Sequence, residues 1–328
     1  MLSILTSILS FASVLSLSVG VTGCGNEHPA KATGSAAVAV TEAAQNQAGA
    51  VAAKDDFPYL LGQPTAVYPL PEALTEVSGI RFLNGKDPHI YAEQDEKGRL
   101  YWLVPGDKTA NYYDFGKNGD YEDLVFLDGK AIFLRSDGDL FSFDVQPALT
   151  AAHKAAVKLT HTTDLVPKGE YEGLYADTVH SRLYMLCKDC AHEDHKKTVA
   201  IHRLDVREGH WVKAASYQVD VAKISELLNL ETQQQSAKKK KHSGRKISFK
   251  PSAICKNPTT GEWYLLSSIN KVLVVTNSDW QVKSVHSLPA KLYPQPEGLC
   301  FDQAGNLFIS NEGQTPGGAT LLKFTPSF

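Results

Sequence analysis

Hydrophobic positions from residue 57 onward fall into short runs that are separated by turns rich in glycine, aspartate and asparagine. Residues 131–134, for example, precede Asp137-Gly138 and then the apolar run 140–143. Short strands joined by tight glycine turns form antiparallel hairpins. The pattern therefore predicts an all-β fold.

A short motif recurs five times in this region. Each copy joins Ser or Glu to a small or short residue and then to an aliphatic residue; the copies are Val77-Ser78-Gly79-Ile80, Tyr121-Glu122-Asp123-Leu124, Tyr171-Glu172-Gly173-Leu174, Pro251-Ser252-Ala253-Ile254 and Pro296-Glu297-Gly298-Leu299. Successive Ser or Glu positions lie 44, 50, 80 and 45 residues apart. Three of these steps match one four-stranded blade of a β-propeller, which takes about 40–50 residues.

The long step is explained by an insertion at about residues 221–248, which begins with a helix-like segment and continues into the lysine run 238–241. Three strands are expected after Glu297, and segment 66–70 can supply the fourth. An N-terminal strand in the last blade closes the ring and removes the open sheet edge. We therefore predict a five-bladed β-propeller of four-stranded antiparallel blades.

The motif positions carry the candidate chemistry. The first strand of each blade lines the central channel, so Glu122, Glu172 and Glu297 are expected to converge there, beside Ser78 and Ser252. Carboxylates about 5 Å apart repel by roughly 3 kcal/mol per pair at an effective dielectric constant near 20. A bound cation would offset this repulsion, and hard oxygen ligands around a wide channel favour calcium. Alternatively, the glutamates only accept hydrogen bonds from nearby backbone amides.

A second acidic set follows the second strand of several blades. Glu93 and Glu312 are expected at the channel mouth, where a ligand would bind. Asp95 and Asp137 follow second strands as well, but they are equally typical of ordinary turns.

The cysteines of the body form two groups. Cys187 and Cys190 lie close to His192 and His195, so a small-loop disulfide, a zinc site and free thiols are all open, and export of the chain favours the disulfide. Cys255 and Cys300 follow their motif positions by three residues and are expected to pack as buried apolar side chains.

The N-terminal segment is typical of an export signal. Residues 1–23 contain no charged side chain, and small residues precede Cys24, which resembles the lipobox of bacterial lipoproteins. We expect a signal peptide over 1–23, a lipidated Cys24, a disordered tether over 24–55 and the propeller over 56–328. An uncleaved membrane helix is the alternative. Either interpretation predicts a protein of the bacterial cell envelope, held at the membrane through Cys24 in the first case.

Charge and motifs exclude other classes. The net charge of −3 gives no field that would attract nucleic acid, so no nucleic-acid partner is expected. The lysine run 238–241 is either a solvated loop or a contact for an anionic partner. The sequence contains no nucleophile elbow, zinc-protease helix or phosphate-binding glycine loop.

The succession of motifs, ending in Pro296-Glu297-Gly298-Leu299 and Ser310-Asn311-Glu312-Gly313, resembles the SdiA-regulated, YjiK-like family. The resemblance extends over nearly all of residues 60–328. It implies a five-bladed propeller with a bound calcium ion and a distant similarity to proteins with NHL repeats, some of which are hydrolases.

Two functions remain open at this point. The first is a calcium-binding, non-catalytic module that presents its channel mouth to a small molecule or a protein. The alternative is a calcium-dependent hydrolase of lactones, esters or phosphoesters, with Glu312 or Glu93 as the general base.

Overall fold

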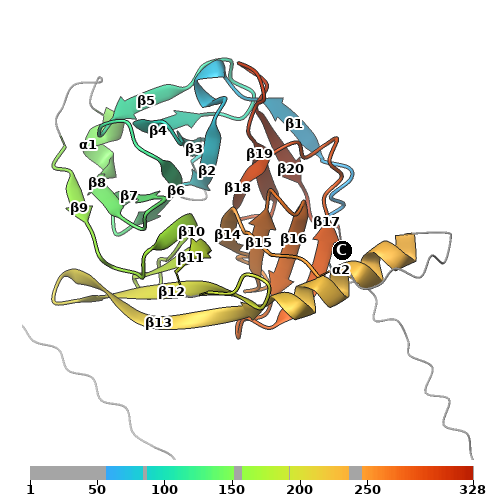
Figure 1. The fold of residues 1–328 in the computed structure, drawn as a ribbon. Helices are drawn as coiled ribbons and strands as arrows, with labels where there is room; N and C mark the ends of the chain where they lie inside the picture. The colour runs from blue at the N-terminus through green and yellow to red at the C-terminus, as the bar shows by residue number, and fades with distance from the viewer. Residues whose placement is uncertain (1–56, 84–86, 151–156, 192, 236–245, 328) are drawn as a thin grey trace, which may run out of the picture. The chain divides into compact units, whose positions relative to one another are not determined.

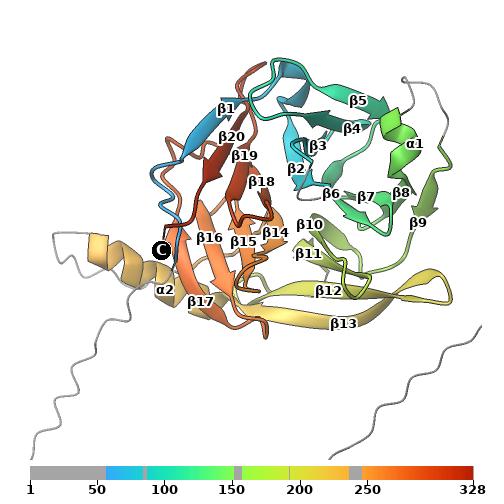
Figure 2. The same ribbon diagram turned by 180° about the vertical axis from the view of Figure 1, so that it is seen from behind.

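The computed structural model describes residues 57–83, 87–150, 157–191, 193–235 and 246–327. In these residues, the strands form five four-stranded antiparallel sheets that are arranged as blades around a central axis (Figure 1). The view from behind shows the same ring (Figure 2). The predicted all-β, five-bladed propeller is therefore confirmed.

Four blades each use four consecutive strands. Their bounds are β2 (Val77–Phe82), β3 (Ile90–Gln94), β4 (Lys97–Leu103) and β5 (Asn111–Asp114) in blade 1; β6 (Tyr121–Leu127), β7 (Lys130–Arg135), β8 (Leu140–Asp144) and β9 (Thr160–Thr162) in blade 2; β10 (Gly169–Asp177), β11 (Arg182–Cys190), β12 (Thr198–Arg207) and β13 (His210–Asp220) in blade 3; and β14 (Ala253–Lys256), β15 (Trp263–Ser267), β16 (Val272–Thr276) and β17 (Val282–Ser287) in blade 4. The first strand of each blade lies innermost.

The fifth blade joins the two ends of the propeller. It contains β18 (Pro296–Phe301), β19 (Leu307–Asn311), β20 (Thr320–Phe324) and the N-terminal strand β1 (Ala66–Pro69). β1 pairs antiparallel with β20, with Val67 opposite Leu322. This is the predicted closure, and it holds the first and last blades together without a free edge between them.

Burial follows from the packing of the blades. Every residue of β15, β16 and β19 is buried, because both faces of these inner strands pack against neighbouring blades. Between blades 3 and 4, the rings of Tyr184 on β11 and Trp263 on β15 lie with their centroids 4.8 Å apart. Continuous apolar runs such as Val272-Leu273-Val274-Val275 therefore belong to inner strands, whereas the outer strand β13 alternates toward solvent.

Within the described part of the chain, three helical elements connect the strands. They are the 3-10 helix η1 (Glu72–Leu74) and the α-helices α1 (Val145–Thr150) and α2 (Val221–Gln235). α2 follows β13 where the sequence predicts a helical insertion, and Val221 and Ile224 bury their side chains in the same cluster as Val285 of β17. The insertion is thus attached to the propeller through the first turns of α2.

Several expectations concern residues outside the described ones. The predicted leader 1–23, Cys24, the tether 24–55 and the lysine run 238–241 all fall there. Within the described residues, no helix combines the length and the apolar character needed to cross a lipid bilayer.

Candidate functional site

The motif residue stands on a β-bulge in four of the five innermost strands. The register between the first and second strands shifts at each of them: between Val77 and Ile80, Tyr121 and Asp123, Tyr171 and Gly173, and Pro296 and Leu299. A bulge removes a residue from the ladder and redirects its side chain. The repeated sequence motif is therefore a repeated bulge, which presents Ser78, Glu122, Glu172 and Glu297 from equivalent positions.

Steric crowding explains why a small residue follows the motif position. A Cβ atom added to Gly298 would lie 2.5 Å from the carbonyl oxygen of Ser78, and one added to Gly79 would lie 2.8 Å from the Cα atom of Asp123. Backbone atoms cannot be approached so closely. Neighbouring inner strands therefore nearly touch around the axis, and glycine is required where they do.

The three motif glutamates influence one another's pKa values. Burial, followed by the charge of Glu172, raises the pKa of Glu122 to about 9. Burial also raises the pKa of Glu172 to about 8, and Glu297 contributes to that rise. The pKa of Glu297 is raised mainly by burial, although hydroxyl groups of Ser268 and Ser252 hydrogen-bond to it. These three carboxyl groups, on the innermost strands of three blades, therefore lie near enough to influence one another's pKa.

Lys188 on β11 is a member of this site that the sequence analysis missed. Its ammonium group pairs with the Glu172 carboxylate, and it lies 2.9 Å from Oε1 of Glu170. Burial acts to lower the pKa of Lys188, but Glu172 and Glu170 together raise it. The lysine therefore stays charged and neutralises part of the axial acidity.

The position of Lys188 repeats in every blade. It follows the second-strand residue that lies opposite the start of the motif, and the equivalents are Asp95, Ser136 and Glu312. In blade 4, Ser268 directly follows the second strand β15. Aligning the ends of the second strands would have found Lys188. The same alignment places Asp137 one residue farther on, where it pairs with Arg135 at the surface. Asp137 is therefore a turn residue in this structure.

Glu93 is the most deeply buried carboxyl group at this end. Its side chain is fully buried, and Oε1 accepts a hydrogen bond of 2.5 Å from the backbone N–H of Gly79. Oε2 has no hydrogen-bond donor among the described residues. Burial, together with the charges of Glu122, Asp123 and Asp95, raises the pKa of Glu93 well above its usual value. An oxygen in this state requires a proton, a water molecule or a cation.

Glu312 and Asp95 complete a ring of acidic residues. Burial and the neighbouring Glu76 raise the pKa of Glu312 to about 8, with Glu297 and Asp95 adding to the effect. Burial raises the pKa of Asp95 to about 6. We call the whole set the acidic mouth; its residues are Glu93, Asp95, Glu122, Glu172, Lys188, Glu297 and Glu312.

A cavity opens beside the acidic mouth. It has a volume of about 380 Å³, and its lining includes Glu172, Lys188, Ser252, Ser268 and Glu297. A small polar ligand can therefore contact the axial carboxylates and hydroxyls directly.

Arg81 closes the channel below the acidic mouth. Its guanidinium group donates hydrogen bonds to the backbone carbonyls of four blades, at 2.8 Å to Ile80, 2.5 Å to Leu299, 2.5 Å to Leu174 and 3.1 Å to Ile254. Blade 2 contributes the carboxylate of Asp123 instead, whose Oδ2 lies 2.8 Å from Nη2. A single side chain thus links all five blades on the axis.

The sequence contains a signal for Arg81 that the motif search did not use. Arg81 stands three residues after Ser78, and the equivalent residues are Val125, Tyr175, Cys255 and Cys300. A charged residue at a position that is apolar in the other four blades indicates that Arg81 has a role specific to blade 1. Its partner Asp123 replaces the glycine or alanine of the other motifs and also accepts hydrogen bonds from the backbone of Leu124 and Leu174.

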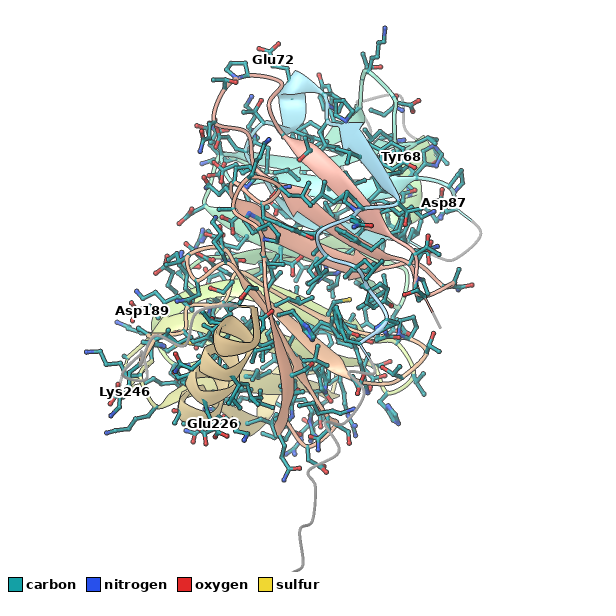
Figure 3. All side chains as sticks on the ribbon, turned by 90° about the vertical axis from the view of Figure 1, so that its right-hand side faces the viewer. Tyr68, Glu72, Asp87, Asp189, Glu226 and Lys246 are labelled. Carbon is teal, nitrogen blue, oxygen red and sulfur yellow. A yellow bond between two sulfur atoms is a disulfide. The ribbon has the colours of Figure 1, made fainter. Side chains whose placement is uncertain are left out.

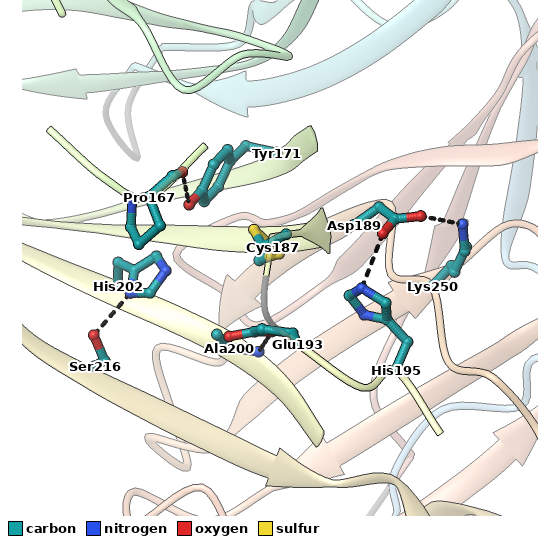
Figure 4. The surroundings of a disulfide bond; sticks show 11 residues. Pro167, Tyr171, Cys187, Asp189, Glu193, His195, Ala200, His202, Ser216 and Lys250 are labelled. Carbon is teal, nitrogen blue, oxygen red and sulfur yellow. Dashed lines mark hydrogen bonds and ion pairs between the residues drawn. A yellow bond between two sulfur atoms is a disulfide. The ribbon is translucent and has the colours of Figure 1, made fainter. Parts of the chain in front are cut away.

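Cys187 and Cys190 form a disulfide bond at the end of β11 (Figure 4). The two residues between them have opposite charges and different partners. Lys188 pairs with Glu172, whereas Asp189 pairs with Lys250 at 2.6 Å and with His195 at 3.1 Å. The disulfide therefore closes a short loop that delivers Lys188 to the axis. His192 lies outside the described residues. Cys255 and Cys300 are free and buried.

The side chains of the acidic mouth offer oxygen donors that can be compared with the ligands of a metal ion. Among the described residues, no three carboxylate, imidazole or thiolate groups are gathered closely enough to form a ready-made metal site. The available donors are carboxylates and hydroxyls, which are the ligands that calcium prefers. The unpartnered Oε2 of Glu93 adds a buried acceptor. The chemistry of these residues fits a hard divalent cation.

Fold and site together define a five-bladed β-propeller with an acidic mouth on its axis. The chain belongs to the SdiA-regulated family, whose model matches residues 66–315. No curated protein matches the sequence.

The chain is similar to several solved structures. Glutaminyl cyclase of Myxococcus xanthus is 15% identical with a TM-score of 0.51, over 81% of this chain and 96% of that chain. A luciferin-regenerating enzyme is 9% identical with a TM-score of 0.47, over 81% and 98%. Regucalcin of Agrobacterium tumefaciens, a calcium-binding protein, is 13% identical with a TM-score of 0.44, over 83% and 96%. At 15% identity, the likeness to the cyclase concerns the fold alone.

Proposed function

We propose that the protein is a calcium-binding β-propeller whose acidic mouth binds a small molecule or a protein partner. The observation that carries the proposal is a set of buried carboxyl groups at the axis, in which the fully buried Glu93 leaves Oε2 without a hydrogen-bond donor among the described residues. When they are ionised, these groups repel one another. Glu93 interacts with Glu122, Glu122 with Glu172, Glu172 with Glu297, Glu297 with Glu312, and Glu312 with Asp95, which in turn acts on Glu93. A divalent cation would relieve this repulsion more fully than Lys188 does.

The motif glutamates are the proposed ligands. Glu122, Glu172 and Glu297 would supply carboxylate oxygens, and the hydroxyl of Ser252 or Ser268 would add neutral oxygens from blade 4. Calcium accepts six to eight oxygen ligands in flexible geometry, which suits donors contributed by separate blades. When bound, the ion would supply positive charge at the mouth and positions for further oxygen ligands.

The proposal is tested by calorimetric titration of the purified protein with calcium. We expect binding in the unmodified protein and a loss of at least about tenfold in affinity in Glu122→Gln, which keeps the shape of the side chain but removes a carboxylate ligand. Asp137→Asn is the matched control, because Asp137 lies in an exposed turn and pairs with Arg135. The absence of calcium binding in the unmodified protein would refute the proposal.

Glu312 favours a second candidate, a calcium-dependent hydrolase. Its pKa of about 8 is close to the pH at which a general base works best, and its side chain is half-buried at the mouth. Assay of the calcium-loaded protein on lactones, aryl esters and phosphoesters separates the two functions. Turnover that disappears in Glu312→Gln would identify a hydrolase, whereas calcium binding without turnover supports the binding module.

The same proposal includes attachment to the bacterial cell envelope through a lipid on Cys24. The supporting observation is the uncharged leader that ends in small residues before this cysteine. In a bacterial host, the unmodified protein should fractionate with membranes and take up labelled fatty acid. Cys24→Ser should take up no label, and equal labelling of both proteins would contradict the anchor.

A further inference from the structure

The disulfide between Cys187 and Cys190 bridges a break in the pairing of β10 with β11. Cys187 and Asp189 lie opposite successive residues of β10, so Lys188 between them has no partner in the ladder. A bulged residue of this kind is left unpaired, and the ladder is disrupted around it. The disulfide joins a residue before the bulge to a residue beyond it, and it therefore restrains the backbone that carries Lys188.

Both cysteines are fixed by their surroundings. Cys187 is fully buried, and Cys190 is 5% exposed. A Cβ atom added to Gly169 of β10 would lie 2.7 Å from Sγ of Cys190, so β10 packs directly against the disulfide. The backbone N–H of Ala191 also donates to the carbonyl oxygen of Lys168 at 3.0 Å. The two residues between the cysteines therefore cross a span that is fixed at both ends.

The two residues inside the disulfide loop are held by ion pairs on different sides. The Lys188 ammonium group pairs with Glu172 and lies 2.9 Å from Oε1 of Glu170. The Asp189 carboxylate pairs with Lys250 at 2.6 Å (Figure 4). Lys188 is thus held toward the axis, whereas Asp189 is held toward the segment that precedes β14.

The disulfide loop lies on the face of the ring that carries the acidic mouth. In the edge-on view of Figure 3, Asp189 and Lys246 lie on one face of the ring, and Asp87 lies on the other. The Lys188 side chain is 21% exposed and the Glu172 side chain 9%, and both line the cavity of about 380 Å³. A cation that enters this cavity must displace the ammonium group from Glu172 or share the carboxylate with it.

The restraint on Lys188 affects its competition with a cation. A lysine on a restrained backbone loses less conformational entropy when it pairs than a lysine on a mobile loop, so it competes better for the carboxylate. We propose that the disulfide between Cys187 and Cys190 is a positioning element of the acidic mouth, which holds the Lys188 ammonium group on Glu172 and lowers the affinity of the mouth for calcium. The protein with two free thiols at these positions therefore binds calcium more tightly. The effect on affinity rests on the proposed function, whereas the restraint on Lys188 does not.

The restraint is measured first, without calcium. In EGTA, acetic anhydride should acetylate Lys188 slowly in the unmodified protein, because its ammonium group is paired and mostly buried. Cys187→Ala/Cys190→Ala should speed this acetylation at least about threefold relative to the exposed Lys197, because local opening of the loop exposes the amine. Peptide mass spectrometry measures both lysines in one digest, and an unchanged ratio would refute the restraint.

The matched control removes the other two buried cysteines of the body. Cys255 and Cys300 form no disulfide, so Cys255→Ala/Cys300→Ala should leave the acetylation of Lys188 unchanged. Equal acceleration in the two double variants would mean that loss of buried side chains loosens the whole propeller, and it would contradict a specific restraint.

The unmodified chain covers the case in which the double variant does not fold. Excess dithiothreitol transfers two electrons and two protons to the disulfide, becomes a cyclic disulfide itself and leaves Cys187 and Cys190 as thiols. Because Cys255 and Cys300 are already free, the two forms differ in one bond among the described residues. In EGTA, the backbone amides of residues 187–191 should exchange hydrogen at least about threefold faster in the reduced protein, and equal rates would refute the restraint.

Calcium affinity is then compared in a double-mutant cycle with Lys188→Met. Calorimetric titration with calcium should give an affinity at least about threefold higher in Cys187→Ala/Cys190→Ala than in the unmodified protein. In the Lys188→Met background, the same two substitutions should leave affinity unchanged, since no ammonium group remains to be released. An equal change in both backgrounds would overturn the positioning role. The absence of calcium binding in all four proteins would refute the proposed function, and the acetylation and exchange rates would still decide the restraint.

Discussion

Nη2 of Arg81 lies 2.8 Å from Oδ2 of Asp123, and both side chains are buried on the axis of the propeller. Removing one member of a buried ion pair leaves the other charge unpaired and costs roughly 3–5 kcal/mol. Arg81→Met should cost at least this much, because the same guanidinium also binds carbonyls of four blades. Urea denaturation of the two proteins measures the difference in the free energy of unfolding.

The control for this prediction is the exposed pair between Arg135 and Asp137. Arg135→Met should change the free energy of unfolding by about 1 kcal/mol or less, as surface ion pairs generally do. If Arg81→Met proved as mild as Arg135→Met, Arg81 would not be the link between the blades.

Lys188 competes with calcium for the axial carboxylates if the proposed function is correct. Its ammonium group pairs with Glu172, a proposed ligand. Lys188→Met keeps the aliphatic stem and removes the charge, so calcium affinity should rise by about tenfold or more. Calorimetric titration of both proteins with calcium measures this change.

Lys197 offers a matched control for Lys188. It is strongly exposed and pairs with Asp194 at 3.1 Å, so Lys197→Met should leave calcium affinity unchanged. Weaker calcium binding in Lys188→Met would instead show that the lysine organises the site.

Calcium binding should release protons at neutral pH. Burial and Glu172 raise the pKa of Glu122 to about 9, so this carboxyl group is largely protonated at pH 7 before calcium binds. A carboxylate ligand must lose its proton, and affinity should therefore rise as pH increases from about 6 to 9, by up to about tenfold per pH unit for each proton displaced. Titrations in buffers with different ionisation enthalpies count the released protons, and a result of zero at pH 7 would contradict the prediction.

The same carboxyl groups make stability depend on pH when calcium is absent. The pKa of Glu122 and of Glu172 is raised in the folded protein, so the folded state binds more protons than the unfolded state. Their contribution to stability is complete below the unfolded pKa and is lost as pH rises toward 8 to 9. In EGTA, thermal melting temperature should therefore fall over this range, and calcium should reduce the fall.

The fold could be predicted because the same local solution is used in each blade. Four of the five innermost strands contain a bulge, and neighbouring inner strands lie in close contact, which leaves a Ser or Glu followed by a small or short residue at regular spacing. The closing strand β1 was predictable because the last blade otherwise contained only three strands. Because the motif repeats, the arrangement of the five blades around the axis could be predicted from short sequence segments.

The site was only partly predictable, since two of its charges are not repeated. Lys188 and Arg81 occupy positions where other blades have residues of different chemistry, and their roles depend on partners from several blades. For Glu172, the motif predicts its position on the innermost strand but not its ion pair with Lys188. Periodicity therefore identifies the equivalent positions but not the interactions across the axis.

Gly298 tests how closely the inner strands pack. A Cβ atom there would lie 2.5 Å from the carbonyl oxygen of Ser78 and also collide with Oγ of Ser310. Gly298→Ala should therefore lower the free energy of unfolding by about 2 kcal/mol, since inserting a group into a packed region forces the backbone to move. Gly62→Ala is the control, because no atom lies within 4 Å of the added Cβ. Urea denaturation compares the two, and equal stability would mean that the strands have room to separate; a weaker calcium affinity in Gly298→Ala would further show that this spacing sets the position of Glu297.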